Sequence, residues 1–179
     1  MALVPTSLPA LEPITLAQAK AHLRLDSADE DALVAGLIAA ARLHLEEVLA
    51  RAMITQSWSY LFDRWPAGST VRLPLAPVQS ITVVRVYGID DAAVVLPADT
   101  YILDGQSRPP RLVRRAALAW PRPGRNANGI EIVFVAGHGS LPAEVPQPLR
   151  QAILLLVAHW FERREPIEIG TTAIPLPGM

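Results

Sequence analysis

Residues 29–62 read DEDALVAGLIAAARLHLEEVLARAMITQSWSYLF, and the pattern of apolar residues changes within this stretch. Apolar side chains recur every three or four positions from Leu33 to Leu49, which predicts an amphipathic helix of about six turns. Its charged residues are expected mainly on the solvated side: Asp31, Arg42, Glu46 and Glu47. After Met53 the residues become β-branched and aromatic, which predicts a strand. The chain therefore combines helices with strands.

Two further helices are predicted on either side of this stretch. Thr15-Leu16-Ala17-Gln18 fits a capping box and predicts a helix over about residues 15–25. Ser27-Ala28-Asp29-Glu30 repeats this logic and places the long helix over about residues 28–51. After Pro146 the helical period returns, which predicts a third helix over about residues 146–164.

A β region is predicted between the long helix and the third helix, over about residues 56–136. Short segments rich in β-branched and aromatic residues are separated there by glycine and proline turns. Ile130, Ile132 and Phe134 could face its core. We expect an α+β fold with three principal helices and a small antiparallel β region. Residues 1–165 are expected to form one domain, followed by an extended C-terminal tail, residues 166–179.

The composition excludes several classes of protein. The chain has 179 residues, of which 51% are hydrophobic and 18% charged, so it can bury a core and is not disordered throughout. A net charge of -1 argues against a protein that coats nucleic acid through a global positive field. Without cysteine, a disulfide scaffold and a thiolate nucleophile are excluded. We expect a cytoplasmic protein without a membrane span, since residues 1–11 lack a signal-peptide pattern and residues 152–161 are too short to cross a bilayer.

No catalytic or metal-binding motif stands out. The four histidines lack the spacing of a zinc site: His22, His44, His138 and His159. Gly137-His138-Gly139-Ser140 is glycine-rich but lacks a phosphate-loop pattern, and no nucleophilic-serine motif occurs. We therefore expect neither enzyme activity nor a metal or cofactor. One alternative stays open, namely a small hydrolase or ligand-binding domain whose site lies near His138 and an arginine-rich loop.

That loop contains six arginines and no acidic residue between positions 108 and 125, which makes a local basic patch. The arginines are Arg108, Arg111, Arg114, Arg115, Arg122 and Arg125. The functional interpretation is contact with an acidic partner surface or a nucleic-acid backbone. The alternative is a set of solvated loop arginines whose stems pack on prolines and Trp120.

The tail, residues 166–179, is apolar and contains three prolines but has no helical or strand period. Such a segment cannot fold alone and suits docking along the surface of a partner. Its candidate docking residues are Ile167, Ile169, Ile174, Pro175, Leu176 and Met179.

Short segments spread over almost the whole chain match a family pattern in their order and spacing. They are Ile14–Leu25, Asp29–Asp31, Ile54–Trp58, Leu73–Ile81, Tyr101–Asp104, Trp120-Pro121, Val133–Gly139 and Val145–Glu165. Together they resemble the head-tail connector (adaptor) family of long-tailed bacteriophages and related gene transfer agents. The chain departs from the family at Gly137-His138-Gly139, where an aromatic residue is the commoner neighbour of the glycine.

The resemblance implies a mainly helical core with the β region inserted into it. It also implies a structural protein that forms a ring of about twelve copies between the portal and the tail of a phage or phage-like particle. The ring would extend the DNA channel, and DNA would pass through it without sequence-specific binding. The implied partners are the portal protein, engaged by the C-terminal tail, a tail-side connector or stopper protein, and further copies of the chain. The implied location is the head-tail junction of a particle assembled in the bacterial cytoplasm.

Overall fold

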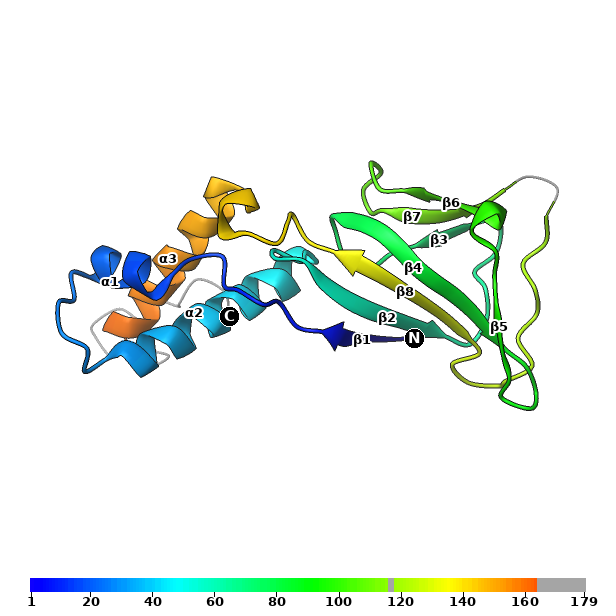
Figure 1. Cartoon of the computed structure of the whole chain (residues 1–179), viewed down its shortest axis with the longest axis horizontal. Coiled ribbons are helices and arrows are strands. Elements are labelled where there is room, and N and C mark those ends of the chain that lie inside the picture. The colour runs from blue at the N-terminus through cyan, green and yellow to red at the C-terminus, as the bar shows by residue number, and fades with distance from the viewer. Residues whose placement is uncertain (116–117, 164–179) are drawn as a thin grey trace, which may run out of the picture.

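Helices gather at one end of the molecule and strands at the other in the computed structural model, which describes residues 1–115 and 118–163 (Figure 1). The helical body consists of α1 (Leu16–Leu23), α2 (Asp31–Leu49) and α3 (Gln147–Glu162). The β body consists of two antiparallel sheets. The predicted tail, residues 166–179, lies outside the described residues.

Five strands form the larger sheet, in the order β1-β2-β8-β4-β5, and three form the smaller one, in the order β3-β7-β6. The larger sheet contains β1 (Ala2–Ser7), β2 (Gln56–Phe62), β8 (Ile130–Ala136), β4 (Val78–Tyr87) and β5 (Ala93–Val95). The smaller sheet contains β3 (Thr70–Arg72), β7 (Arg111–Arg114) and β6 (Tyr101–Asp104). Because β8 lies at the centre of the larger sheet, both of its edges are paired.

The β body has an apolar core of its own. Ile130, Ile132 and Phe134 alternate along β8 and are fully buried, which confirms that these residues face the core. Val71 of β3 and Leu112 of β7 belong to the same buried cluster. The core therefore joins the two sheets.

The helical body has a second core. Val34 and Ile38 of α2 are buried with Ile153 and Val157 of α3, at the four-residue spacing of one helix face. Ile14, just before α1, is buried in the same cluster and closes it from the N-terminal side.

The expectation of a mainly helical core is therefore wrong, although three helices and an antiparallel β region are present. Helix and strand contribute about equally to the described chain, and the β body is large enough to bury its own core. Part of the strand content is not predicted by any pattern in the local sequence. β1 contains Pro5 and pairs with β2 at every position except Thr6, and β2 lies some fifty residues further along the chain.

One of the two predicted capping boxes forms. The N–H of Gln18 donates to Thr15 Oγ1 (3.1 Å), and Gln18 Oε1 accepts from the Thr15 N–H (3.0 Å), as predicted. The second box is wrong, because α2 begins at Asp31 and the N–H of Asp31 donates to the carbonyl of Ala28. Residues 27–30 thus form a turn before the helix.

Within the two described ranges, every helix is too short or too polar to cross a membrane.

Candidate functional surfaces

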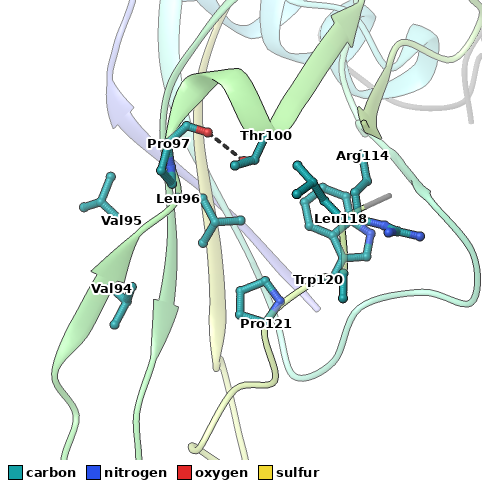
Figure 2. Close-up of a pocket in the computed structure, with 10 residues that line it drawn as sticks. Val94, Val95, Leu96, Pro97, Thr100, Arg114, Leu118, Trp120 and Pro121 are labelled. Carbon is teal, nitrogen blue, oxygen red and sulfur yellow. Dashed lines mark hydrogen bonds between the residues drawn. The ribbon is translucent and has the colours of Figure 1, made fainter. Parts of the chain in front are cut away.

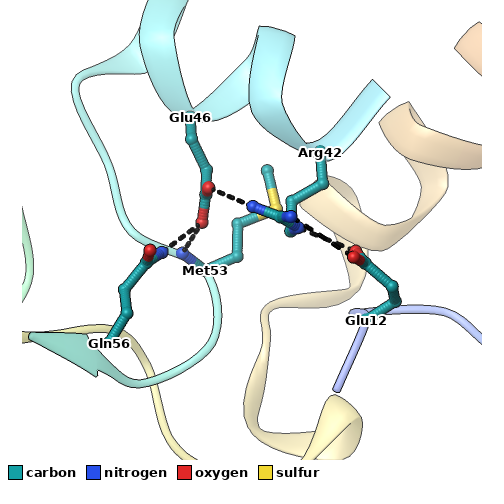
Figure 3. A network of polar contacts seen from close by, with 5 residues as sticks. All are labelled: Glu12, Arg42, Glu46, Met53 and Gln56. Carbon is teal, nitrogen blue, oxygen red and sulfur yellow. Dashed lines mark hydrogen bonds and ion pairs between the residues drawn. The ribbon is translucent and has the colours of Figure 1, made fainter. Parts of the chain in front are cut away.

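A buried polar network joins the helical body to the β body at the end of α2 (Figure 3). Arg42 Nε donates to Glu12 Oε2 (2.7 Å), and Arg42 Nη1 donates to Glu46 Oε2 (2.7 Å). The other oxygen of Glu46 accepts from the Met53 N–H (2.7 Å) and from Gln56 Nε2 (2.8 Å). Since Gln56 begins β2, this network fixes the direction in which the chain enters the β body.

The expectation that Arg42 and Glu46 lie on the solvated side of α2 is wrong. Their exposed fractions are 7% and 8%. Burial by itself lowers the pKa of Arg42, but the hydrogen bonds and charges of Glu12 and Glu46 outweigh burial and raise this pKa above its ordinary value. The guanidinium is therefore held charged between two carboxylates, which is how a buried ion is tolerated.

The predicted basic patch does not form one cluster. Arg111 Nε forms an ion pair with Asp104 Oδ2 (2.8 Å) across the β6–β7 hairpin. Arg125 Nε forms an ion pair with Asp91 Oδ1 (2.8 Å), and its guanidinium lies over the ring of Tyr87, 4.7 Å from the centroid. Acidic residues from other segments therefore neutralise part of the patch, which the local sequence does not reveal.

Two arginines of the patch lie together in an open groove of about 1160 Å³ on the β body, which we call the arginine groove. Its cationic side chains are Arg64, Arg72, Arg108 and Arg111. Arg72 and Arg111 are register partners on β3 and β7, so two cations stand side by side on one strand pair. Arg64 and Arg72 were missed by sequence reasoning, because they lie more than thirty residues before the patch and only strand pairing brings them to it.

Asp104 beside this groove is held ionised. Ser107 Oγ donates to Asp104 Oδ2 (2.6 Å), the Ser107 N–H donates to Asp104 Oδ1 (3.1 Å), and Arg111 pairs with the same carboxylate. The Ser107 hydroxyl, the Arg111 guanidinium and the Ser107 N–H lower the pKa of Asp104 to about 2. The groove is lined by four arginines and one carboxylate, that of Asp63, and the carboxylate of Asp104 lies beside it. Because the arginines outnumber the two carboxylates, the surface is cationic.

An apolar hollow of about 270 Å³ lies beside the edge strand β5 (Figure 2). Leu96, Pro97, Leu118 and Pro121 contribute apolar walls, and Arg114 of the predicted patch also lines it. Trp120 lines it too and stacks on Trp65, with ring centroids 4.1 Å apart. Arg114 is therefore separated from the arginine groove and faces a different surface.

The alternative of a site near His138 gains no support. The His138 N–H donates to the carbonyl of Met53, and burial, followed by the charge of Arg51, lowers the pKa of its imidazole. Neither the arginine groove nor the apolar hollow is lined by His138. Among residues 1–115 and 118–163, no group of three or more acidic or histidine side chains is arranged to hold a metal ion.

Comparison with solved structures relates this architecture to particle necks. One structure of the neck of an empty gene transfer agent (GTA) particle, computed with C6 symmetry, contains a chain 28% identical to this one, with a TM-score of 0.83; the match covers 96% of this chain and 89% of that chain. A virion of a native GTA particle contains a chain 26% identical, with a TM-score of 0.81, over 98% of this chain and 90% of that one.

A third similar structure is the neck of a native GTA particle computed with C12 symmetry. Its matching chain is 26% identical, with a TM-score of 0.76, and the match covers 98% of this chain and 89% of that chain. No protein-family model matches this chain, and a search of curated proteins finds no match either. The likeness to the three structures supports a structural role in the neck of a phage-like particle.

Proposed function

We propose that this protein is a head-tail connector: a ring of copies placed between the portal and the tail of a phage-like particle, where it extends the DNA channel. The observation that carries the proposal is the match to neck chains over 96–98% of the chain, which includes both the helical body and the β body. Cyclic symmetry in these necks supports a closed ring of identical subunits.

Partners of this ring follow from its position. The portal protein contacts it on the head side, a tail-side connector or stopper protein contacts it on the other side, and DNA passes through the channel. We assign portal docking to the tail, residues 166–179, because its apolar residues favour burial on a partner and repetition around a ring strengthens weak contacts. Assembly takes place in the bacterial cytoplasm.

Affinity capture of the tagged protein from particle-producing cells tests the connector role. Mass spectrometry is expected to identify portal and tail proteins, and electron microscopy to show ring-shaped density. Recovery of a clean monomer from a lysate that demonstrably contains the portal would contradict the proposal.

Deletion of residues 166–179 tests the tail. The truncated protein is expected to keep its circular dichroism spectrum but to lose attachment to particles, because the two described cores lie entirely within residues 1–163. A full-length variant with Ile174→Ser, Leu176→Ser and Met179→Ser should lose attachment as well, if burial of these side chains provides the binding energy. Unchanged attachment of both variants would remove the docking role of the tail.

A further inference from the structure

The outer face of α2 carries a single charged residue where a solvated helix normally carries several. Its exposed apolar side chains include Leu33 (40% exposed) and Leu43 (56%). Among the exposed positions of Asp31–Leu49, Glu47 is the sole charged residue. The two other charged residues in the middle and last turns, Arg42 and Glu46, point inward and belong to the buried network. Surface helices of a monomer usually have charged residues on this side.

Helical geometry gathers these residues into one surface. Successive residues are 100° apart around a helix, so positions three and four apart lie on the same face. The face opposite Val34, Ile38 and Ala41 carries Ala32, Leu33, Gly36, Ala40, Leu43 and Glu47, and we call it the open face of α2. Apart from Glu47 the open face is apolar, and a contiguous exposed apolar surface marks an interaction site.

Among residues 1–115 and 118–163, no contact explains a glycine at position 36. A Cβ added at this glycine would meet nothing within 4 Å, and glycine in a helix interior is about 1 kcal/mol less favourable than alanine. With Ala32 and Ala40 one turn away on each side, it leaves a shallow strip in which another helix could approach closely.

A counterpart lies on α3. Leu155 is 57% exposed and stands on the side of α3 opposite Ile153 and Val157, which are buried against the helical core. α2 and α3 both contribute their buried faces to this shared core. Their open faces therefore point outward in different directions. A cyclic ring requires two different faces per subunit, and the helical body offers both.

We propose that the open face of α2 packs against the side of α3 that carries Leu155 in the next copy of the ring. The inference rests on the proposed connector function, since the occupant is a second copy of this chain and the supporting observation is the cyclic symmetry of the similar necks. It assigns the contact between subunits to the helical body.

The absence of cysteine allows a clean crosslinking test. The double variant Leu43→Cys/Leu155→Cys is treated with a short bis-maleimide in purified particles. Because residue 43 of one copy would meet residue 155 of the next, the chains should be linked into a ladder of multimers. Each single variant, and the control pair Leu43→Cys/Ala92→Cys, should give no ladder, since Ala92 lies in the β4–β5 turn of the β body.

A labelling experiment provides an independent measurement. In the single variant Leu43→Cys, the thiol should react with a maleimide dye in the free protein and become at least tenfold less reactive in particles, whereas the thiol of Ala92→Cys should remain reactive. Equal reactivity of the introduced thiol at position 43 in both states, or a crosslink from it to a different protein, would overturn the interface. Absence of the wild-type chain from particles would instead contradict the connector function itself.

Discussion

Glu46 illustrates how one buried side chain can hold two parts of a molecule together. Its carboxylate accepts hydrogen bonds from Arg42, from the N–H of Met53 and from Gln56. In Glu46→Ala the donors of all three residues lose a partner, and the charge of Arg42 is left with Glu12 alone. We expect the free energy of unfolding to fall by about 3 kcal/mol, measured by urea denaturation.

Glu47→Ala is the matched control for this prediction. Glu47 is the adjacent acidic residue on the exposed side of α2, so its removal should change the free energy of unfolding by less than about 0.5 kcal/mol. Equal losses in the two variants would show that the network contributes little to stability.

The pKa of Asp104 gives stability a dependence on acid pH. Its folded-state pKa, about 2, lies below the ordinary value of 3.8, so the charged form is favoured by folding. The resulting stabilisation is present above pH 3.8 and is lost as the pH falls toward 2. In Asp104→Asn we expect a smaller loss of stability across this interval than in the wild type, measured by urea unfolding at each pH. Parallel stability curves for the two proteins would contradict this prediction.

At the scale of single residues, sequence patterns fail where partners come from distant segments. Arg42 and Glu46 have the local spacing of a solvated pair, yet they are buried because Glu12, Met53 and Gln56 supply partners from three other positions. Thr15 and Gln18 were predicted correctly because a capping box is made entirely from residues three apart.

At the scale of elements, two of the three connections between the bodies contact each other. The Thr55 N–H donates to the Gly139 carbonyl, and the His138 N–H donates to the Met53 carbonyl, so the connection from α2 to β2 contacts the one from β8 to α3. Gly137 lies at this contact with a φ of 136°, and a Cβ there would be 2.6 Å from the Thr55 nitrogen. The close approach explains why glycine follows β8.

Gly137→Ala is therefore expected to lower the free energy of unfolding by more than about 3 kcal/mol, because steric overlap with the neighbouring backbone adds to the strain of a positive φ. Gly68→Ala provides the control, since Gly68 also has a positive φ, 91°, but a Cβ there meets nothing within 4 Å. It should cost about 1 kcal/mol. Thermal unfolding of both variants measures the difference, and equal losses would rule out the steric contribution.

Strand prediction succeeded where the local pattern was strong and failed elsewhere. β8 was identified from its own residues, with Ile132 and Phe134 correctly assigned to the core. β1 was missed, because its assignment depends on pairing with β2 and on no property of residues 2–7 themselves. Missing such segments made the predicted β region smaller than the one observed, while the mainly helical core was an expectation taken from the family resemblance.

For the whole molecule, sequence reasoning located a basic patch but not the surface to which it belongs. Pairing of β3 with β7 adds Arg72 to Arg111, while Arg114 and Arg125 lie on other surfaces. The arginine groove is therefore assembled by the fold from two distant segments. Its charge complements a polyanion, and if the chain is the connector proposed above, that polyanion is the phosphate backbone of DNA.

The arginine groove predicts weak, salt-dependent binding to double-stranded DNA that is independent of sequence. Each arginine that neutralises a phosphate contributes about 0.9 to the slope of log affinity against log salt concentration. The triple variant Arg64→Ala/Arg72→Ala/Arg108→Ala should therefore reduce the magnitude of this slope by about two to three, measured by fluorescence anisotropy at several salt concentrations.

The variant Arg115→Ala/Arg122→Ala is the control, since both residues belong to the sequence patch but neither lines the groove. If the control loses as much affinity as the triple variant, the contact is a diffuse effect of net charge. If wild-type binding does not respond to salt, phosphate contact through the groove is wrong and the arginines contact protein instead.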